Sequence, residues 1–154
     1  MITYSEFVEK VKEFEGLRLK AYKCPSGVLT IGYGHTHGVV SNMEITPSDA
    51  VLLLLADLEI ARYQLKSLFP TSYFIACNFG LFYAITDFVF NVGFTKFKNS
   101  TLLNVLKSID FSHPLSHNDV NRISIQLLRW VHSNGKVLRG LEARRQWEVS
   151  LLTM

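Results

Sequence analysis

Apolar residues recur at helical spacing near the start of the chain. Four of them fall on one face between residues 3 and 14: Phe7, Val8, Val11 and Phe14. Thr3 and Glu6 have the spacing of a capping box, in which each side chain bonds the other residue's backbone N–H. Gly16 is a natural helix terminator. The pattern therefore predicts a first helix over residues 3–14.

A second, longer helix is predicted from Pro47 to about residue 69. Thr46 is the expected N-cap, Pro47 fits the first helical position, and Asp49 places an acid in the first turn. The run AVLLLLADLEIARYQLKSLF follows and stops before Pro70. A helix of ~23 residues spans roughly 35 Å at 1.5 Å per residue. It is long enough to connect two lobes.

Between these helices the pattern changes to short extended runs. LKAYKC and VLTIGYG are compatible with strands, and the turn signal PSG separates them. Four later segments again favour helices: NFGLFYAITDFVFNVG, NSTLLNVLKSI, NDVNRISIQLLRWV and GLEARRQWEVSLL. We therefore predict an α+β fold that is mainly helical, with one small sheet near the N-terminus.

Composition narrows the class of protein. A chain of 154 residues with 48% hydrophobic and 19% charged residues is globular rather than disordered. The formal charge of +3 only weakly favours an anionic partner. The longest apolar run is far shorter than the roughly 20 residues that cross a bilayer. The N-terminus lacks the pattern of a signal peptide, so we expect a protein made in the cytoplasm whose export needs outside help.

Cysteine usage gives no sign of a disulfide framework. The two cysteines, Cys24 and Cys77, do not have the spacing of a zinc site either. Cys77 lies in YFIACNF and is expected to be a buried small hydrophobe. No His, Cys and Asp cluster has ligand spacing, so we expect no metal and no cofactor.

Candidate chemistry gathers near the first helix end. The negative end of a helix and the apolar neighbours Phe14 and Leu17 would both favour a protonated Glu15, as a general acid requires. The simpler interpretation is a solvated surface glutamate. If the two strands pair, Cys24 and Thr30 approach each other near this helix end. By themselves, a cysteine is more often a core residue and a threonine a good strand former.

The window EGLRLKAYKCPSGVLTIGYGHT resembles the phage-type lysozymes, glycoside hydrolase family 24. That family carries Glu-x8-(Asp/Cys)-x5-Thr, which here falls on Glu15, Cys24 and Thr30. FVFNVGFTKFKNSTLL is similar to its second core motif and RWVHSNGKVLRGLEARR to its C-terminal motif. The order and spacing of the motifs extend the resemblance over nearly the whole chain.

The resemblance implies a single lysozyme domain with a bilobal fold. A sheet lobe would span about residues 17–45, a connecting helix about 47–69, and a helical lobe about 1–15 and 70–154, with substrate in the cleft between the lobes. The implied substrate is the β-1,4 bond between N-acetylmuramic acid and N-acetylglucosamine in peptidoglycan. Glu15 would be the general acid, Cys24 would stand in the place of the second catalytic residue, and Thr30 would position water. An inverting reaction is expected.

Cys24 departs from the aspartate that is commoner at this position. An unperturbed thiol has a pKa near 8.5, so only about 3% is thiolate at pH 7. To accept a proton from water, Cys24 needs a lowered pKa, for which Lys23 and His35 are the nearby candidates. His35 is expected either to hydrogen-bond near Glu15 and shape the cleft, or to close the hairpin as a structural histidine.

Further residues match family positions near the sugar-binding cleft: Phe90, Asn91, Ser100 and Arg144. Aromatic faces and amides suit pyranose rings and N-acetyl groups. For Phe90 the favoured interpretation is the helix core, and Asn91 could be a helix C-terminal residue. Either Arg144 or Arg145 could reach the active-site carboxylate, although an exposed basic face is the favoured interpretation.

Three functions therefore compete. The first is a phage or prophage endolysin, a monomer that acts on bacterial peptidoglycan after release, with a membrane hole-former (a holin) as a possible partner. The second is a wall-binding module that keeps the fold but has lost turnover through Cys24. The third is a basic nucleic-acid binder, which lacks a recognition helix dense in Lys and Arg and leaves the glycine-rich window unexplained.

Overall fold

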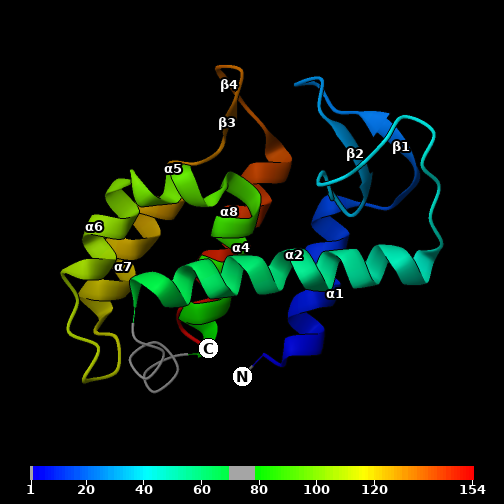
Figure 1. Ribbon diagram of the computed structural model, residues 1–154. Helices are drawn as coiled ribbons and strands as arrows, with labels where there is room; N and C mark the ends of the chain where they lie inside the picture. The colour runs from blue at the N-terminus through cyan, green and yellow to red at the C-terminus, as the bar shows by residue number, and fades with distance from the viewer. Residues whose placement is uncertain (1, 70–78) are drawn as a thin grey trace. The chain divides into compact units, whose positions relative to one another are not determined.

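The computed structural model describes residues 2–69 and 79–154 (Figure 1). The chain divides into two compact units. The sheet unit comprises Tyr4–Ile60, and the helical unit comprises Met1–Thr3 and Ala61–Met154. The first helix therefore belongs with the sheet, whereas the resemblance grouped residues 1–15 with the later helices. Cys77 lies outside the described residues.

The first helix of the sheet unit, α1, spans Tyr4–Glu15 and includes Glu15 as its last residue. Phe7, Val8 and Val11 are buried, as the helical spacing predicted. Gly16 ends the helix in the left-handed conformation, with φ 69°, and its N–H donates to Lys12 O over 3.0 Å. This termination fixes where the Glu15 side chain leaves the helix.

The predicted strands form an antiparallel pair (Figure 1). β1 (Arg18–Lys23) pairs with β2 (Leu29–Gly32) so that Tyr22 faces Thr30. Residues 24–28 connect the strands, and Cys24 N–H donates to Val28 O over 3.0 Å, which leaves residues 25–27 as the hairpin loop. Gly27 N–H donates to Cys24 O over 2.8 Å, and Gly27 has φ 83°. This is the three-residue hairpin loop that ends in a left-handed glycine, and it places Cys24 at the first position of the turn.

The long helix α2 spans Pro47–Leu68, as predicted. Thr46 and Asp49 form the expected reciprocal cap: Asp49 N–H donates to Thr46 Oγ1 over 3.1 Å, and Thr46 N–H donates to Asp49 Oδ2 over 3.0 Å. The buried residues of the helix follow one stripe with helical spacing: Ala50, Leu54, Leu58, Ala61 and Leu65.

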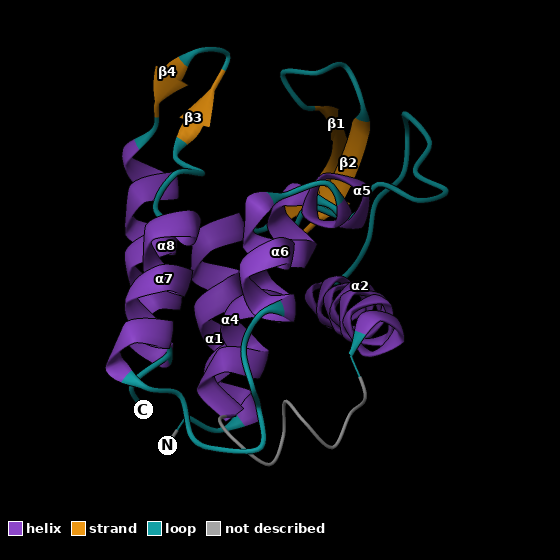
Figure 2. Cartoon of the chain, turned by 90° about the vertical axis from the view of Figure 1, so that its left-hand side faces the viewer, coloured by secondary structure: helices purple, strands orange, loops and turns teal. Residues whose placement is uncertain are grey.

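The helical unit contains every later helix that the sequence predicted. These are α4 (Phe79–Val92), α6 (Thr101–Lys107), α7 (His117–Leu127) and α8 (Arg139–Leu151). α4 packs against α8, and α7 packs against both α6 and α8 (Figure 2). The core centres on α4, whose residues from 80 to 89 are almost all buried. A charged group inside this apolar core is therefore unusual.

Two elements of this unit were not predicted. The short helix α5 (Phe94–Lys98) continues the chain directly after α4, where Gly93 adopts φ 89°. A small hairpin pairs β3 (His132–Ser133) with β4 (Lys136–Val137). Its turn places Asn134 at φ 50° and Gly135 at φ 73°, the two-residue turn that favours Asn-Gly.

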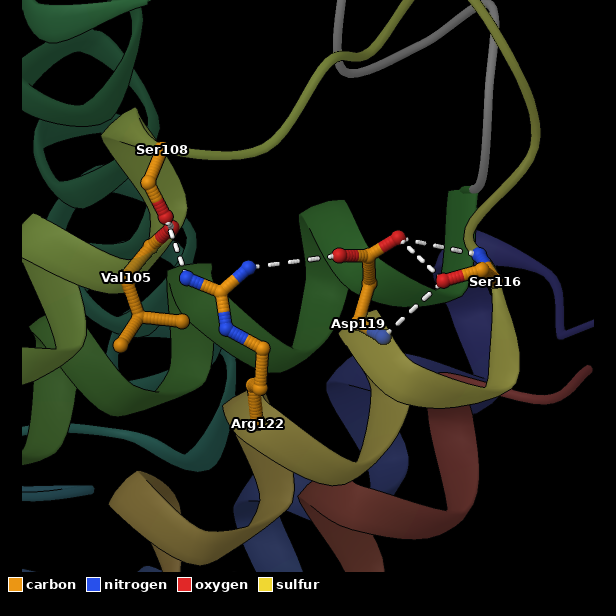
Figure 3. A network of polar contacts seen from close by, with 5 residues as sticks. All are labelled: Val105, Ser108, Ser116, Asp119 and Arg122. Atoms are coloured by element: carbon orange, nitrogen blue, oxygen red, sulfur yellow. Dashed lines mark hydrogen bonds and ion pairs between the residues drawn. The ribbon is translucent and has the colours of Figure 1, made fainter.

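Polar contacts hold the start of α7 to the end of α6 (Figure 3). Ser116 caps α7 in a capping box with Asp119. Arg122 lies between Asp119 Oδ1, 3.5 Å away, and Ser108 Oγ, to which it donates over 2.5 Å. Ser108 in turn donates to Val105 O over 2.7 Å.

Among the described helices, none combines the length and the apolar character that crossing a membrane requires.

Candidate functional site

The carboxylate of Glu15 lies against the turn that follows β2. Ile31 and His35 exchange two backbone hydrogen bonds of 2.9 Å, which close a tight turn over residues 32–34. A Cβ atom added to Gly34 would lie only 3.0 Å from Glu15 Oε2, and Gly34 has φ 85°. Only glycine satisfies both constraints. The turn that receives Glu15 thus begins two residues after Thr30.

Cys24 and Thr30 meet at the other end of the hairpin. Cys24 Sγ lies 2.9 Å from Ser26 Oγ, and Thr30 is buried with its hydroxyl donating to Val28 O over 3.1 Å. These contacts lower the pKa of Cys24 from 9.0 to about 7. The largest cause is the hydrogen bond from the Ser26 side chain, which outweighs desolvation, and backbone groups of Ser26 and Val28 and the Thr30 hydroxyl contribute less.

The Cys24 pKa is lowered, as a proton acceptor requires, but the candidate causes named from the sequence are wrong. The causes are hydrogen bonds of the turn, and neither Lys23 nor His35 is among them. Cys24 occupies the first turn position, where Asp, Asn and Ser commonly bond groups two residues later. A thiolate there accepts the same bonds. A larger fraction of the Cys24 thiol is therefore ionised near pH 7 than in an ordinary cysteine.

His35 connects the turn to the long helix. Its Nδ1 lies 2.8 Å from Asp57 Oδ2 on α2, and its Nε2 lies 2.8 Å from His37 O. Together with the Ile31–His35 bridge, these contacts hold the turn after β2 to α2. Asp57 was not predicted as a site residue, because a single acid on a long helix is usually solvated.

The family positions Phe90 and Ser100 lie in the helical unit. Ser100 is buried as the N-cap of α6: its Oγ accepts from Leu103 N–H and donates to Phe97 O over 2.7 Å. Its hydroxyl is thus engaged in capping the helix. Phe90 is half-buried, and the guanidinium carbon of Arg144 lies 5.8 Å from the centroid of its ring.

The exposed basic face predicted for Arg144 and Arg145 is wrong. Both side chains are buried, together with Asp87 and Glu148. Arg144 binds Asp87 through two hydrogen bonds, Nε to Oδ2 over 2.8 Å and Nη2 to Oδ1 over 2.7 Å. Arg145 Nη2 lies 2.8 Å from Glu148 Oε1. Asp87 was missed, although a lone acid in the apolar run of α4 indicates a cationic partner.

Burial governs the ionisation of this cluster. It raises the pKa of Glu148 well above its ordinary value, and the nearby Asp87 carboxylate raises it further. Burial also lowers the pKa of Arg145. Burial therefore favours the protonated form of Glu148. No group of three or more potential metal ligands occurs among residues 2–69 and 79–154.

Residues 12–148 match the phage lysozyme family. The chain belongs to this family. The resemblance read from the three motifs is thereby confirmed, and so is the mainly helical fold with small antiparallel sheets. The family motif falls on Glu15 at the end of α1, on Cys24 at the first position of the hairpin turn, and on Thr30 in β2.

Known family members resemble the chain over most of its length. An endolysin of Acyrthosiphon pisum secondary endosymbiont phage 1 is 37% identical over 92% of this chain and 90% of the relative. A protein of Bacteriophage PS34 named SAR-endolysin is 32% identical over 87% of this chain and 73% of its own length. The muramidase domain of SpmX from Asticaccaulis excentricus aligns with a TM-score of 0.79 at 30% identity, covering 100% of this chain and 98% of that domain.

Proposed function

We propose that this chain is a peptidoglycan hydrolase that cleaves the β-1,4 bond between N-acetylmuramic acid and N-acetylglucosamine. The observation that carries the proposal is the ionisable Cys24, which lies beside Thr30 on the β1–β2 hairpin. The turn that follows β2 lies against the Glu15 carboxylate. These are the residues of the family motif. The names of its relatives, endolysin and muramidase domain, support the same substrate.

In the proposed reaction Glu15 donates its proton to the glycosidic oxygen as the bond to the anomeric carbon breaks. A water molecule forms the new bond to that carbon and loses a proton to the Cys24 thiolate. The Thr30 hydroxyl donates its one proton to Val28 O. Its oxygen is left to accept a hydrogen bond from the water and so orient it. Attack opposite the leaving group inverts the anomeric configuration.

The biological setting we propose is bacterial cell-wall lysis by a phage or prophage endolysin. Peptidoglycan is then the partner, and the protein acts as a monomer after release through a holin or another export route. Phe90 and Asn91 are proposed as contacts to the sugar rings and their N-acetyl groups.

A wall-binding module without turnover is the second candidate, and the Cys24 thiol in place of an aspartate favours it. Clearing of a peptidoglycan suspension separates the two candidates. The enzyme lowers the turbidity, and Glu15→Gln, which keeps the size and removes the proton donor, abolishes clearing while still sedimenting with the wall. If the native protein sediments with the wall but leaves the turbidity unchanged, the binding module is correct.

A further inference from the structure

The buried cluster of the helical unit ends in one bond to a partly exposed side chain. Arg145 Nη2 donates to Asn91 Oδ1 over 2.8 Å. Asn91 is the second-last residue of α4 and is half-buried, whereas Arg145 is fully buried. A buried guanidinium thus contacts the inner side of a residue whose remaining surface reaches solvent.

The chemistry of the pair fixes the orientation of the amide. A guanidinium carries donors and no acceptor, so the Asn91 atom that faces it must be the oxygen. Because the two ends of an amide point apart, the Nδ2 group is turned away from Arg145. Asn91 therefore presents two N–H donors on the side that the cluster does not occupy.

The cluster holds Arg145 before any ligand arrives. The guanidinium carbon lies 5.0 Å from the centroid of the Phe88 ring, and Glu148 Oε1 lies 2.8 Å from Nη2. Its Nε and Nη1 have no hydrogen-bond partner within the described part of the chain. Within the described residues, the bond to Asn91 is therefore the one aligned hydrogen bond of the Arg145 guanidinium. Because this bond orders the Asn91 side chain in advance, Asn91 loses less entropy when it binds a ligand.

We infer that Arg145 is a positioning residue that holds Asn91 so that its amide N–H groups bind an acceptor oxygen of the glycan, such as an acetamido carbonyl. The inference deepens the proposed function and rests on it for the identity of the ligand. The alternative is that Asn91 serves only as the acceptor that satisfies Arg145.

Asn91→Asp separates these two roles. The carboxylate keeps an acceptor for Arg145 and adds an opposite charge, so the thermal midpoint should not fall. The same change removes the amide N–H donors of residue 91, and the new carboxylate repels an acceptor oxygen of the glycan. On soluble peptidoglycan fragments we expect KM to rise about ten-fold with kcat within about two-fold of native. Asn104→Asp, the same change at an exposed position of α6, is the matched control and should leave both constants unchanged.

A double-mutant cycle tests the part of Arg145. Arg145→Lys keeps the charge but not the fixed planar fork, so it should raise KM in the native background. With Asn91→Ala already present, the same change should raise KM no further. An equal rise in both backgrounds, or a native KM in Asn91→Asp, would overturn the inference.

Binding measured in the Glu15→Gln background makes the result independent of turnover. Glu15→Gln and Glu15→Gln with Asn91→Asp are compared for their affinity for intact peptidoglycan. A weaker affinity of the double variant supports the inference even if the native protein clears no wall, in which case the proposed hydrolysis alone fails. Equal affinities overturn the inference while leaving the hydrolysis intact.

Discussion

Removing the Ser26 hydroxyl should return the Cys24 thiol toward its ordinary ionisation. The hydroxyl, 2.9 Å from Sγ, is the largest cause of the lowering from 9.0 to about 7. At a pKa of about 7 half of the thiol is ionised at pH 7, compared with about 1% at 9.0. The backbone groups and Thr30 remain in Ser26→Ala. The Cys24 pKa should therefore rise, but it should stay below 9.0. We expect the thiolate fraction at pH 7 to fall at least about five-fold.

The assay is the ultraviolet absorbance of the thiolate followed against pH, together with the rate of alkylation by iodoacetamide. All variants carry Cys77→Ser, so that one thiol is observed. Ser26→Thr keeps the hydroxyl and serves as the control, with a midpoint close to native. If Cys24 accepts the proton from water, the rising limb of the activity profile shifts to higher pH with the thiol. An unchanged midpoint in Ser26→Ala would refute the role of the hydroxyl.

Three further perturbations test other parts of the structure. Gly34→Ala and Gly38→Ala both force alanine to a positive φ, which costs about 1–2 kcal/mol of unfolding free energy. Only the change at Gly34 also displaces the neighbouring carboxylate, so clearing activity should fall much further there, and equal losses would contradict the placement of that carboxylate. Asp87→Asn leaves Arg144 buried without its countercharge and should cost about 3–5 kcal/mol in urea unfolding, whereas a loss below about 1 kcal/mol would count against a buried ion pair. Cys24→Asp should extend activity to lower pH, because an ordinary carboxylic acid ionises near pH 4, and a rising limb at the native position would exclude residue 24 as the titrating base.

Local signals were sufficient for most of the fold. The Thr46–Asp49 cap and the alternation around the PSG turn act within three or four residues, so the sequence alone predicts them. The β3–β4 hairpin was missed although Asn134 and Gly135 give the ordinary signal for its turn. The five-residue helix α5 is too short to show helical periodicity.

The candidate site depended more on contacts that the sequence does not show. The Asp87–Arg144 bond joins residues 57 positions apart, so only the isolated acid in an apolar helix hinted at it. The role of Ser26 could have been read from the turn, because a side chain at the first turn position commonly bonds groups two residues later. Attention to charged neighbours instead led to Lys23 and His35.

The chemistry of the new chain ends tests the central claim most directly. Intact peptidoglycan is digested with the native protein and with Glu15→Gln, the fragments are reduced with borohydride, and the sugar at each reduced end is identified. We expect reduced N-acetylmuramic acid from the native protein and no new ends from Glu15→Gln. Reduced N-acetylglucosamine, or new ends from Glu15→Gln at the native rate, would contradict the account.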